Sequence, residues 1–366
     1  MKILGSGSRA ATSVVGLALA AVVIAACATD EPAVEEEVEA ATDDDEAEGE
    51  EAREEPSDDD VISIDVGHNQ GTVTDVHQVA LEVAERVSEN SDGSIELNIF
   101  PDSQLGSLTD VADQFMLGAP SIGYVNAPMS ADRGVPELEA AAAMYAFSGS
   151  DEIMTFASSD LMQQWEEELY DQGYVLLAFN WYLGERHIIS DNPDGYPSPE
   201  DMSGDAMRIP VGPTWAAFFD ELPIDAQTID GSEVYTSIQQ GVINGAEGPY
   251  SQMLGWSLQE LSETVSLTAH GQDITGFATG SELWDSLNGE QQEVLREAFR
   301  WGGEQFTTRT IENAADQRQE LEDAGITFVE VDRDAYQAIA DSVYTEENFP
   351  EWGDGALDRV REAAGR

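Results

Sequence analysis

One arginine stands in an unusual setting in this acidic chain. Arg208 lies within the short apolar run AMRIP (206–210), and Pro210 follows two residues later. An arginine side chain stays protonated at any relevant pH, and its planar guanidinium offers parallel N–H donors that match the two oxygens of a carboxylate. Arg208 could therefore bind a carboxylate ligand, or it could pair with a local acid such as Asp205. Taken alone, the residues favour the ion pair, because such pairs outnumber ligand-binding arginines.

The residue patterns of common enzymes are absent from the sequence. No H-E-x-x-H pair or Cys/His cluster is present to bind a metal, and neither a G-x-S-x-G motif nor a P-loop occurs. Pairs of carboxylates are frequent, but the chain has 74 acidic residues against 15 basic ones, so such pairs say little about glycosidase chemistry. We expect no catalytic site, metal or cofactor.

Short apolar runs alternate with amphipathic helical stretches, which predicts an α/β fold. A βαβαβ opening is predicted from strands at 61–67, 94–100 and 121–126, with helices at 74–93 and near 108–115. Ligands of such sheets bind outside the carboxyl ends of the strands. Further strands are predicted at 174–182, 186–190, 206–210, 225–229, 264–270 and 326–331, and further helices near 213–222, 232–241 and 250–261 and at the C-terminus.

This second unit indicates two lobes with a cleft between them. We predict lobe 1 over residues 61–180, lobe 2 over 181–272, and a return to lobe 1 over 273–366. The return includes a nearly continuous helix from 281 to about 323, softened around Gly302 and Gly303.

Residues 1–26 have the features of an export signal, because Lys2 and Arg9 precede an apolar run that stops at Cys27. The segment IAAC (24–27) resembles a bacterial lipobox, in which cleavage before the cysteine leaves its thiol to carry lipid. Cys27 is the only cysteine, so no intramolecular disulfide can form. A buried cysteine in an uncleaved anchor is the alternative. Either way, we expect a protein tethered to the extracytoplasmic face of the cell membrane, in the periplasm or at the cell surface.

The charge of the chain indicates its surroundings. Residues 28–60 hold 18 acidic residues, one arginine and no aromatic residue, which predicts a disordered linker over 27–60, or less readily an acidic interaction tail. Residues 61–366 hold 56 acidic residues, 12 arginines and no lysine. Such a surface stays soluble where salt screens its self-repulsion, so we hypothesise a saline or high-pH habitat. Nucleic acid is disfavoured as a partner, because no basic stripe could neutralise phosphates.

A tethered, two-lobed α/β protein without a catalytic constellation indicates an extracytoplasmic solute-binding protein. Residues 206–250 resemble the signature region of the DctP-type solute-binding proteins of tripartite ATP-independent periplasmic (TRAP) transporters. The motifs that carry this resemblance are Arg208-Ile209-Pro210, Ser232-Glu233-Val234-Tyr235 and Glu247-Gly248-Pro249, with similar segments at 100–107 and 282–298. The resemblance covers nearly all of residues 61–345. It implies a two-lobed, periplasmic-binding-protein-like (type II) fold with a long interlobe helix.

The resemblance also implies roles for individual residues. Arg208 would form the salt bridge to the ligand carboxylate, and Arg186 would be either a second ligand contact or part of an interlobe ion pair. Many family members carry a ligand-binding asparagine where this chain has Gly248. Glu247 or the backbone N–H of Gly248 could take its place and favour hydroxyl or cationic groups, including zwitterionic osmolytes. Alternatively, Glu247 points outward as part of the turn.

The remaining candidates follow from position in the predicted fold. Two follow the first strand, two end the third strand and two flank the arginines; they are Asn69, Gln70, Tyr124, Asn126, Tyr182 and Trp215. His77 is expected to be a packing or capping residue.

The resulting hypothesis is that the lobes close on a small organic acid and that the membrane subunits of a TRAP transporter, driven by an ion gradient, receive it. An ABC-type binding protein, a ligand-sensing ectodomain and an extracellular hydrolase are the alternatives.

Overall fold

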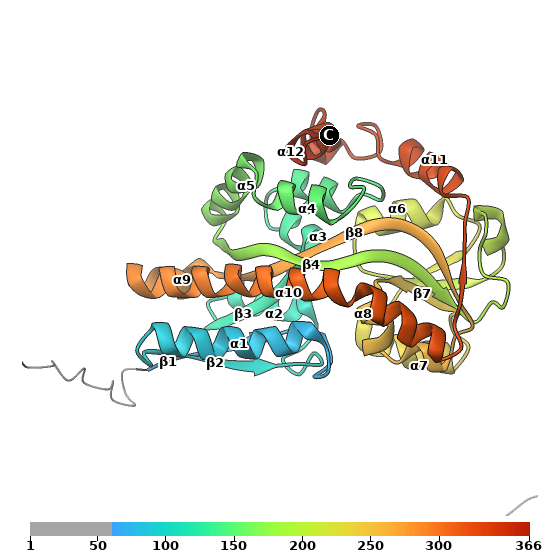
Figure 1. Ribbon diagram of the computed structural model, residues 1–366. Helices are drawn as coiled ribbons and strands as arrows, with labels where there is room; N and C mark the ends of the chain where they lie inside the picture. The colour runs from blue at the N-terminus through green and yellow to red at the C-terminus, as the bar shows by residue number, and fades with distance from the viewer. Residues whose placement is uncertain (1–60) are drawn as a thin grey trace, which may run out of the picture. The chain divides into compact units, whose positions relative to one another are not determined.

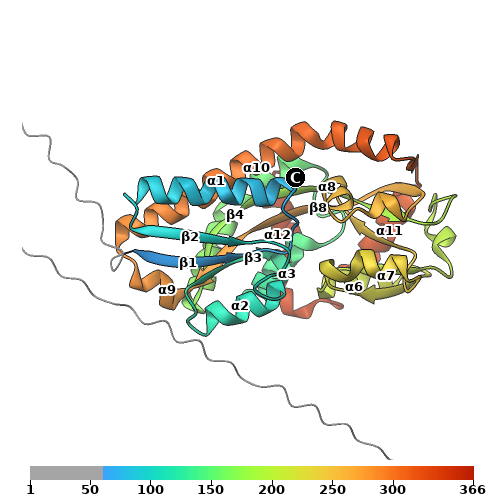
Figure 2. The same cartoon turned by 90° about the horizontal axis from the view of Figure 1, so that it is seen from below.

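The structure, a computed structural model, describes residues 61–366, whose strands form one mixed sheet flanked by helices (Figures 1 and 2). The strand order is β2-β1-β3-β8-β4-β7-β5-β6, with β9 beside β8. The strands are β1 (Ile62–Gly67), β2 (Ile95–Phe100), β3 (Ser121–Asn126), β4 (Tyr174–Ser190), β5 (Ala206–Ile209), β6 (Asp225–Thr228), β7 (Gly245–Gly248), β8 (Thr264–Gly280) and β9 (Thr327–Val329). The lobe of β1, β2 and β3 therefore lies at one end of the sheet, and the lobe of β5, β6 and β7 at the other.

Helices cover both faces of this sheet (Figure 2). They are α1 (Asp75–Asn90), α2 (Leu108–Met116), α3 (Ala127–Ala131), α4 (Ser150–Ala157), α5 (Asp160–Asp171), α6 (Pro213–Asp220), α7 (Val234–Gln239), α8 (Tyr250–Gly255), α9 (Ser281–Ser286), α10 (Gly289–Asp323), α11 (Arg333–Val343) and α12 (Ala356–Ala363). Short 3-10 turns lie at Pro136–Ala142, Pro199–Met202, Gly231–Glu233, Leu258–Glu260 and Pro350–Trp352. The α/β class and the two-lobed arrangement predicted from the sequence are confirmed.

The first lobe follows its sequence pattern closely. β1 pairs in parallel with β2 and with β3, so the carboxyl ends of these strands share one edge. α1 buries the predicted apolar stripe, which includes Val76, Val83 and Val87. At the start of α2, the Ser107 hydroxyl accepts from the backbone of Asp110, and the Asp110 carboxylate accepts from the backbone of Ser107. This reciprocal cap satisfies N–H groups that a helix start leaves unpaired, and it fixes where α2 begins.

Two long antiparallel strands join the lobes. β4 and β8 each contain 17 residues and pair with one another along their length. The lobe boundaries predicted after residues 180 and 272 fall inside these strands. Their pairing is interrupted by several register shifts, one of them between Tyr182 and Gly184. Gly184 has a φ of +126°, a conformation that side chains with a Cβ rarely adopt. The strands therefore bend where they pass between lobes.

The long helix α10 runs along β4 and contacts α1 in one lobe and α8 in the other (Figure 1). The helix predicted from 281 to about 323 is interrupted at 287–288, between α9 and α10, and α10 is continuous through Gly302 and Gly303. A Cβ on Gly302 would lie 2.5 Å from Val83 Cγ2 and 2.8 Å from Trp181 Cζ2. These glycines therefore allow the helix to approach its neighbours closely.

Several elements were not predicted. Residues 127–171 form α3, α4, α5 and a 3-10 turn, although only α5 buries a clear helical stripe, of Met162, Trp165 and Leu169. The strands predicted at 174–182 and 186–190 are one strand, and β8 continues ten residues beyond His270.

No helix in the part of the chain that the structure describes has the length and apolar character needed to cross a membrane.

Replacing Gly302 with alanine should destabilise the fold. The added methyl group would meet rigid side chains, and such overpacking typically costs roughly 1–3 kcal/mol. This exceeds the roughly 1 kcal/mol by which alanine is favoured over glycine in a helix. Urea unfolding should show the loss. Gly289→Ala in the same helix is the matched control, because nothing lies within 4 Å of its Cβ position. Equal unfolding midpoints for the two variants would contradict the close-approach explanation.

Candidate functional site

A cavity of about 260 Å³ lies between the lobes. Its wall takes residues from the carboxyl ends of strands in both lobes and from the strands that join them. The polar residues in the wall are Asn69, Gln70, Ser107, Thr109, Tyr124, Asn126, Arg186, Arg208, Trp215, Asp230, Gln252, Asp273 and Thr275. The β5–β7 and β1–β3 ends therefore meet at one place, as the strand-end argument predicts.

A larger groove of about 1010 Å³ lies elsewhere, on the outside of the first lobe between α5 and α10. Arg300 in this groove pairs with Glu166 at 3.3 Å, and Arg296 stacks on Trp284 while its Nε has no hydrogen-bond partner among the described residues. The interlobe cavity is smaller, yet it contains the buried charges and the sequence-predicted residues, so we take it as the candidate site.

Arg208 is buried in the wall of this cavity with part of its guanidinium unpaired. Its Nε donates to the Ile229 carbonyl at 2.9 Å, and the Trp256 ring lies 5.3 Å from the guanidinium carbon. Nη1 has no hydrogen-bond partner among the described residues, although Glu247 Oε1 lies 3.7 Å away. Burial lowers the pKa of Arg208 to about 10, and Glu247 opposes that shift. The side chain is therefore still cationic at neutral pH.

The alternative pairing of Arg208 with Asp205 is wrong. Asp205 Oδ2 instead accepts from the Tyr196 hydroxyl at 2.7 Å and from Asn192 at 3.4 Å. Its carboxylate is thus held away from Arg208 by neutral partners.

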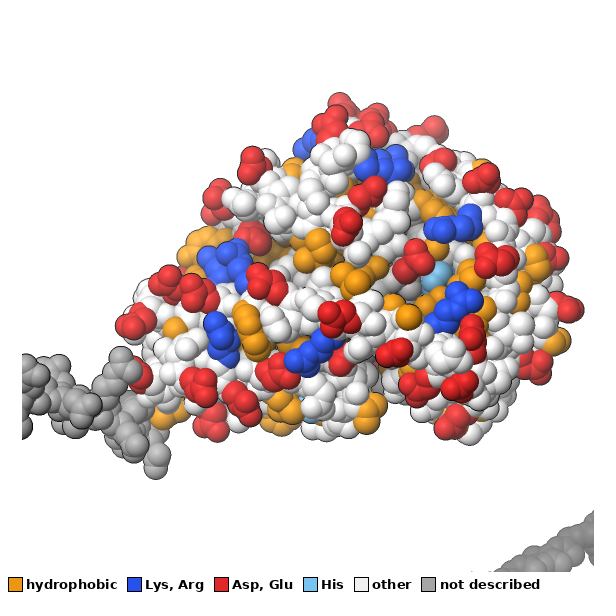
Figure 3. Space-filling model, viewed as in Figure 1, with side chains coloured by type: hydrophobic (Ala, Val, Ile, Leu, Met, Phe, Trp, Pro, Cys, Tyr) orange, Lys and Arg blue, Asp and Glu red, His pale blue; other side chains and the backbone are white. Residues whose placement is uncertain are grey.

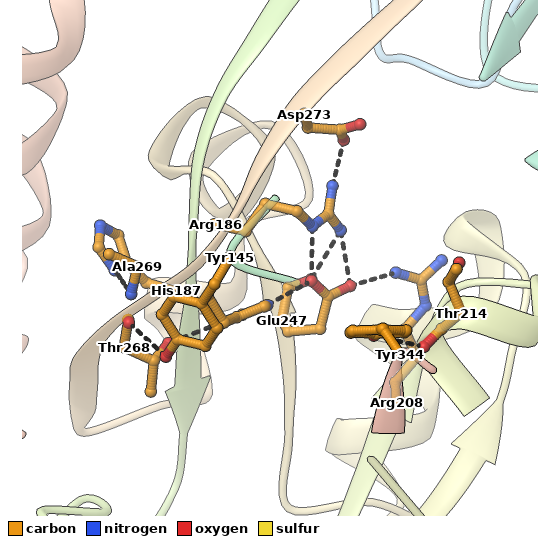
Figure 4. A network of polar contacts seen from close by, with 11 residues as sticks. Tyr145, Arg186, His187, Arg208, Thr214, Glu247, Thr268, Ala269, Asp273 and Tyr344 are labelled. Carbon is orange, nitrogen blue, oxygen red and sulfur yellow. Dashed lines mark hydrogen bonds and ion pairs between the residues drawn. The ribbon is translucent and has the colours of Figure 1, made fainter. Parts of the chain in front are cut away.

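Arg186 lies on β4 with every nitrogen engaged by an acid (Figure 4). Nε and Nη2 donate to the two carboxylate oxygens of Glu247 at 2.5 and 2.6 Å, and Nη1 pairs with Asp273. The face of Trp215 packs against the guanidinium, 5.7 Å from ring centre to guanidinium carbon. Arg186 reaches the cavity wall, but its donors are already used within the protein. The ion-pair prediction for this residue describes its observed contacts, although the pair is buried rather than exposed.

Glu247 points neither outward nor into the cavity. It is 1% exposed, does not line the cavity, and lies against the two arginines and His270. Burial raises the pKa of the carboxyl group, but Arg186 and a hydrogen bond from His270 outweigh it and hold the pKa well below its usual range. Glu247 is therefore ionised, and its role in the observed structure is to orient and neutralise Arg186.

The other predicted residues divide into two groups. Asn69, Gln70, Tyr124, Asn126 and Trp215 line the cavity, whereas Gly248 and Tyr182 do not. The Tyr182 hydroxyl instead donates to Gln272 at 2.5 Å. Gly248 is buried at the end of β7.

Several residues of the wall were not predicted from the sequence, most notably Gln252 and Asp273. Asp273 lies in the half of β8 that was not predicted as a strand, and Gln252 lies in a short helix that gives no ligand-binding signal of its own. Three buried polar atoms of wall residues lack a hydrogen-bond partner among the described residues, namely Arg208 Nη1, Trp215 Nε1 and Gln252 Oε1. Buried polar atoms are usually paired, so such a group in one cavity wall indicates a place for a polar ligand.

A pair of buried histidines supports the first-lobe wall. The backbone N–H of Gln70 donates to His68 Nδ1 at 3.2 Å, so the proton of neutral His68 is on Nε2 and is donated to His77 Nδ1 at 3.1 Å. Burial and the neighbouring His77 lower the pKa of His68 to about 4. The chain of hydrogen bonds is therefore intact at neutral pH and fixes the loop that carries Asn69 and Gln70. His77 packs against His68, in line with its predicted role.

Within residues 61–366, no group of three or more His, Cys, Asp or Glu side chains is arranged to hold a metal ion.

Replacing Glu247 with glutamine should be strongly destabilising. The change leaves two buried arginines with one buried acid between them, and breaking a buried ion pair costs about 3–5 kcal/mol. The matched control is Glu82→Gln, because Glu82 pairs with Arg309 at the half-exposed surface and should cost no more than about 1 kcal/mol. Urea unfolding at pH 7 compares the two. Similar losses for both variants would contradict the central role of the buried pair.

Comparison with known proteins agrees with this geometry. Residues 66–348 match the DctP family, described as bacterial extracellular solute-binding protein, family 7. A solute-binding protein of Roseobacter denitrificans is 27% identical over 76% of this chain and 85% of its own length. Its structure, with bound L-galactonate, has a TM-score of 0.73 at 26% identity and covers 81% of this chain and 98% of that protein.

Another solved TRAP periplasmic solute-binding protein, from Fusobacterium nucleatum, contains bound sn-glycerol-3-phosphate. It has a TM-score of 0.79 at 26% identity and covers 83% of this chain and 97% of its own. The family match spans more than half of the chain and includes every residue of the cavity wall. The chain therefore belongs to the DctP-type solute-binding proteins of TRAP transporters.

Proposed function

We propose that this protein captures a small organic acid anion between its lobes and that Arg208 binds the ligand carboxylate. The observation that carries this proposal is the buried Nη1 of Arg208, which lies in the cavity wall without a hydrogen-bond partner among the described residues. A buried donor left unpaired costs about 1–3 kcal/mol, and more when the group is charged. A ligand carboxylate would remove that cost and form a charge-assisted bond.

The other charges of the site favour a ligand with one negative charge. Arg186 is already neutralised by Glu247 and Asp273. Asp230 and Asp273 are in the cavity wall, so a second carboxylate on the ligand would approach groups of its own sign. Relatives solved with L-galactonate or L-fuconate bound provide examples of small organic acids with one carboxylate.

Ligand capture would proceed by closure of the lobes. The cavity wall draws on both lobes, so a bound anion bridges them and gains contacts that an open state lacks. The bends in β4 and β8 are the places where the connection can flex, since their pairing is already irregular there. The membrane subunits of a TRAP transporter, driven by an ion gradient, would then receive the ligand from the closed form.

The proposals of a membrane tether and of a saline habitat rest on the sequence alone. Cys27 and the acidic linker lie outside the described residues, and we propose that lipid on Cys27 and the linker at 27–60 hold the binding protein near its transporter at the extracytoplasmic face. Figure 3 shows acidic side chains spread over the visible face with few basic ones among them. This supports the hypothesis of a saline setting, in which salt screens the repulsion.

Replacing Arg208 with glutamine should weaken ligand binding about 100-fold or more, because the carboxylate loses its charged partner. Thermal unfolding of the full-length protein in molar salt, against organic acids, sugar acids, keto acids and ectoine-like zwitterions, would identify ligands. A ligand at 100 times its Kd should stabilise the protein by roughly 2.7 kcal/mol.

The control for this experiment is Arg300→Gln, which removes an arginine from the larger outer groove and should leave binding unchanged. A ligand that still binds the Arg208 variant but not the Arg300 variant would place the site in the outer groove. A ligand that binds both variants as tightly as it binds the wild type would also overturn the role of Arg208.

Replacing Cys27 with serine should release the protein from the membrane fraction and abolish incorporation of labelled fatty acid. Serine lacks the thiol that would carry the lipid. Fractionation and metabolic labelling in the native host test this. Unchanged labelling in the Cys27→Ser protein would contradict lipid attachment at this residue.

A further inference from the structure

We propose that Gln252 determines which organic acids bind, because its amide recognises a hydroxyl group beside the ligand carboxylate. The site would then select monocarboxylates that carry such a hydroxyl over analogues that lack it. This inference rests on the proposed function, since it assumes that Arg208 holds the carboxylate.

Gly248 leaves space for the side-chain amide of Gln252. A Cβ at position 248 would lie 2.6 Å from Gln252 Oε1, closer than real Cβ contacts occur. Glycine at the end of β7 therefore lets the amide of Gln252 occupy this position. Any larger residue there would move the amide.

The amide of Gln252 and the guanidinium of Arg208 belong to residues that line the same cavity. β5 and β7 are parallel neighbours, with Arg208 opposite Ala246, so Gly248 lies beside the residues that directly follow Arg208. Gln252 is in the first turns of α8, which begins just after β7, and it lines the same cavity as Arg208. A group bound at Gln252 is thus close to a carboxylate bound at Arg208.

The unpaired polar atoms of the wall are chemically complementary to a hydroxy acid. Gln252 is 7% exposed, and its Oε1 is buried without a hydrogen-bond partner among the described residues. The two other unpaired atoms of the wall, Arg208 Nη1 and Trp215 Nε1, are donors. A carboxylate offers acceptors for two donors, and an adjacent hydroxyl offers the donor that Gln252 Oε1 lacks. A hydroxy acid therefore offers acceptors for the two donors and a donor for Oε1, whereas a plain carboxylate offers no donor for Oε1.

The experiment compares the full-length protein with Gln252→Leu, which keeps the side-chain bulk and removes the amide. The probes are L-galactonate, its 2-deoxy analogue and the zwitterion ectoine, with Kd measured by calorimetry. The wild type should bind L-galactonate about 10- to 100-fold more tightly than the 2-deoxy acid, the range expected when one buried acceptor is left unpaired. In Gln252→Leu the ratio should fall to near one, mainly through weaker binding of L-galactonate.

Two further variants make the result specific. Gly248→Ala keeps Gln252 but displaces its amide, so it should also reduce the ratio, and it carries the test if Gln252→Leu does not fold. Gln240→Leu is the matched control, because Gln240 is exposed and lies outside the cavity, and it should leave the ratio unchanged.

The outcomes separate this inference from the proposed function. If neither acid nor ectoine binds the wild type, the proposed binding of such acids fails together with this inference. If the acids bind in an Arg208-dependent way and the ratio is the same in wild type, Gln252→Leu and Gly248→Ala, only the role of Gln252 is overturned. Tighter binding of ectoine than of L-galactonate would also overturn it, because the amide would then be serving a cationic group.

Discussion

The arrangement of the site depends on the buried ion pair between Arg186 and Glu247. Removing two charges from water is costly, and the cost is met here by a two-point geometry together with Asp273 and His270, which satisfy remaining atoms of the pair. The four residues of this cluster, which lie on β4, β7 and β8, join neighbouring strands at the place where the sheet passes between lobes. Because Arg186 takes both oxygens of Glu247 at short distance, Arg208 is left 3.7 Å away, attracted by the carboxylate but without a hydrogen bond to it.

This distribution of charge explains how an arginine remains available in such an acidic protein. Residues 61–366 hold 56 acidic residues and 12 arginines, so an arginine at the surface readily meets a carboxylate, as Arg133, Arg309 and Arg359 do. Burial separates Arg208 from those surface acids, and Glu247, which forms an ion pair with it at 3.7 Å, is already committed to Arg186. The acidic surface and the anion-binding cavity are therefore compatible, because they occupy different dielectric surroundings.

The sequence predicted the parts of this structure that local patterns determine. The valine stripe of α1 and the alternation of strands and helices indicated the first lobe, and the motif around Arg208 indicated an arginine that lines the interlobe cavity. It could not predict features that depend on distant partners. Nothing local shows that Glu247 faces Arg186, 61 residues away, or that Gly302 lies against Trp181. The place of Gln252 in the cavity wall could not be predicted, because it depends on the missing Cβ of Gly248. The apolar run at 140–147 lacks a period, and tertiary packing alone decides its fold.

Each wall of the cavity is fixed within its own lobe, which limits what closure can change. In the first lobe the hydrogen bonds from Gln70 to His68 and from His68 to His77 fix the loop with Asn69. In the second lobe, Glu247 and the Ile229 carbonyl fix the two arginines. A change in the distance between the walls must therefore be absorbed by β4 and β8, whose register shifts and Gly184 interrupt regular pairing. A ligand can favour the closed state only through contacts that join the walls, and its differential affinity for the two states sets how far the population shifts. If Arg208 binds the ligand carboxylate as proposed, this preformed arginine accounts for affinity, and the groups facing it across the cavity account for closure.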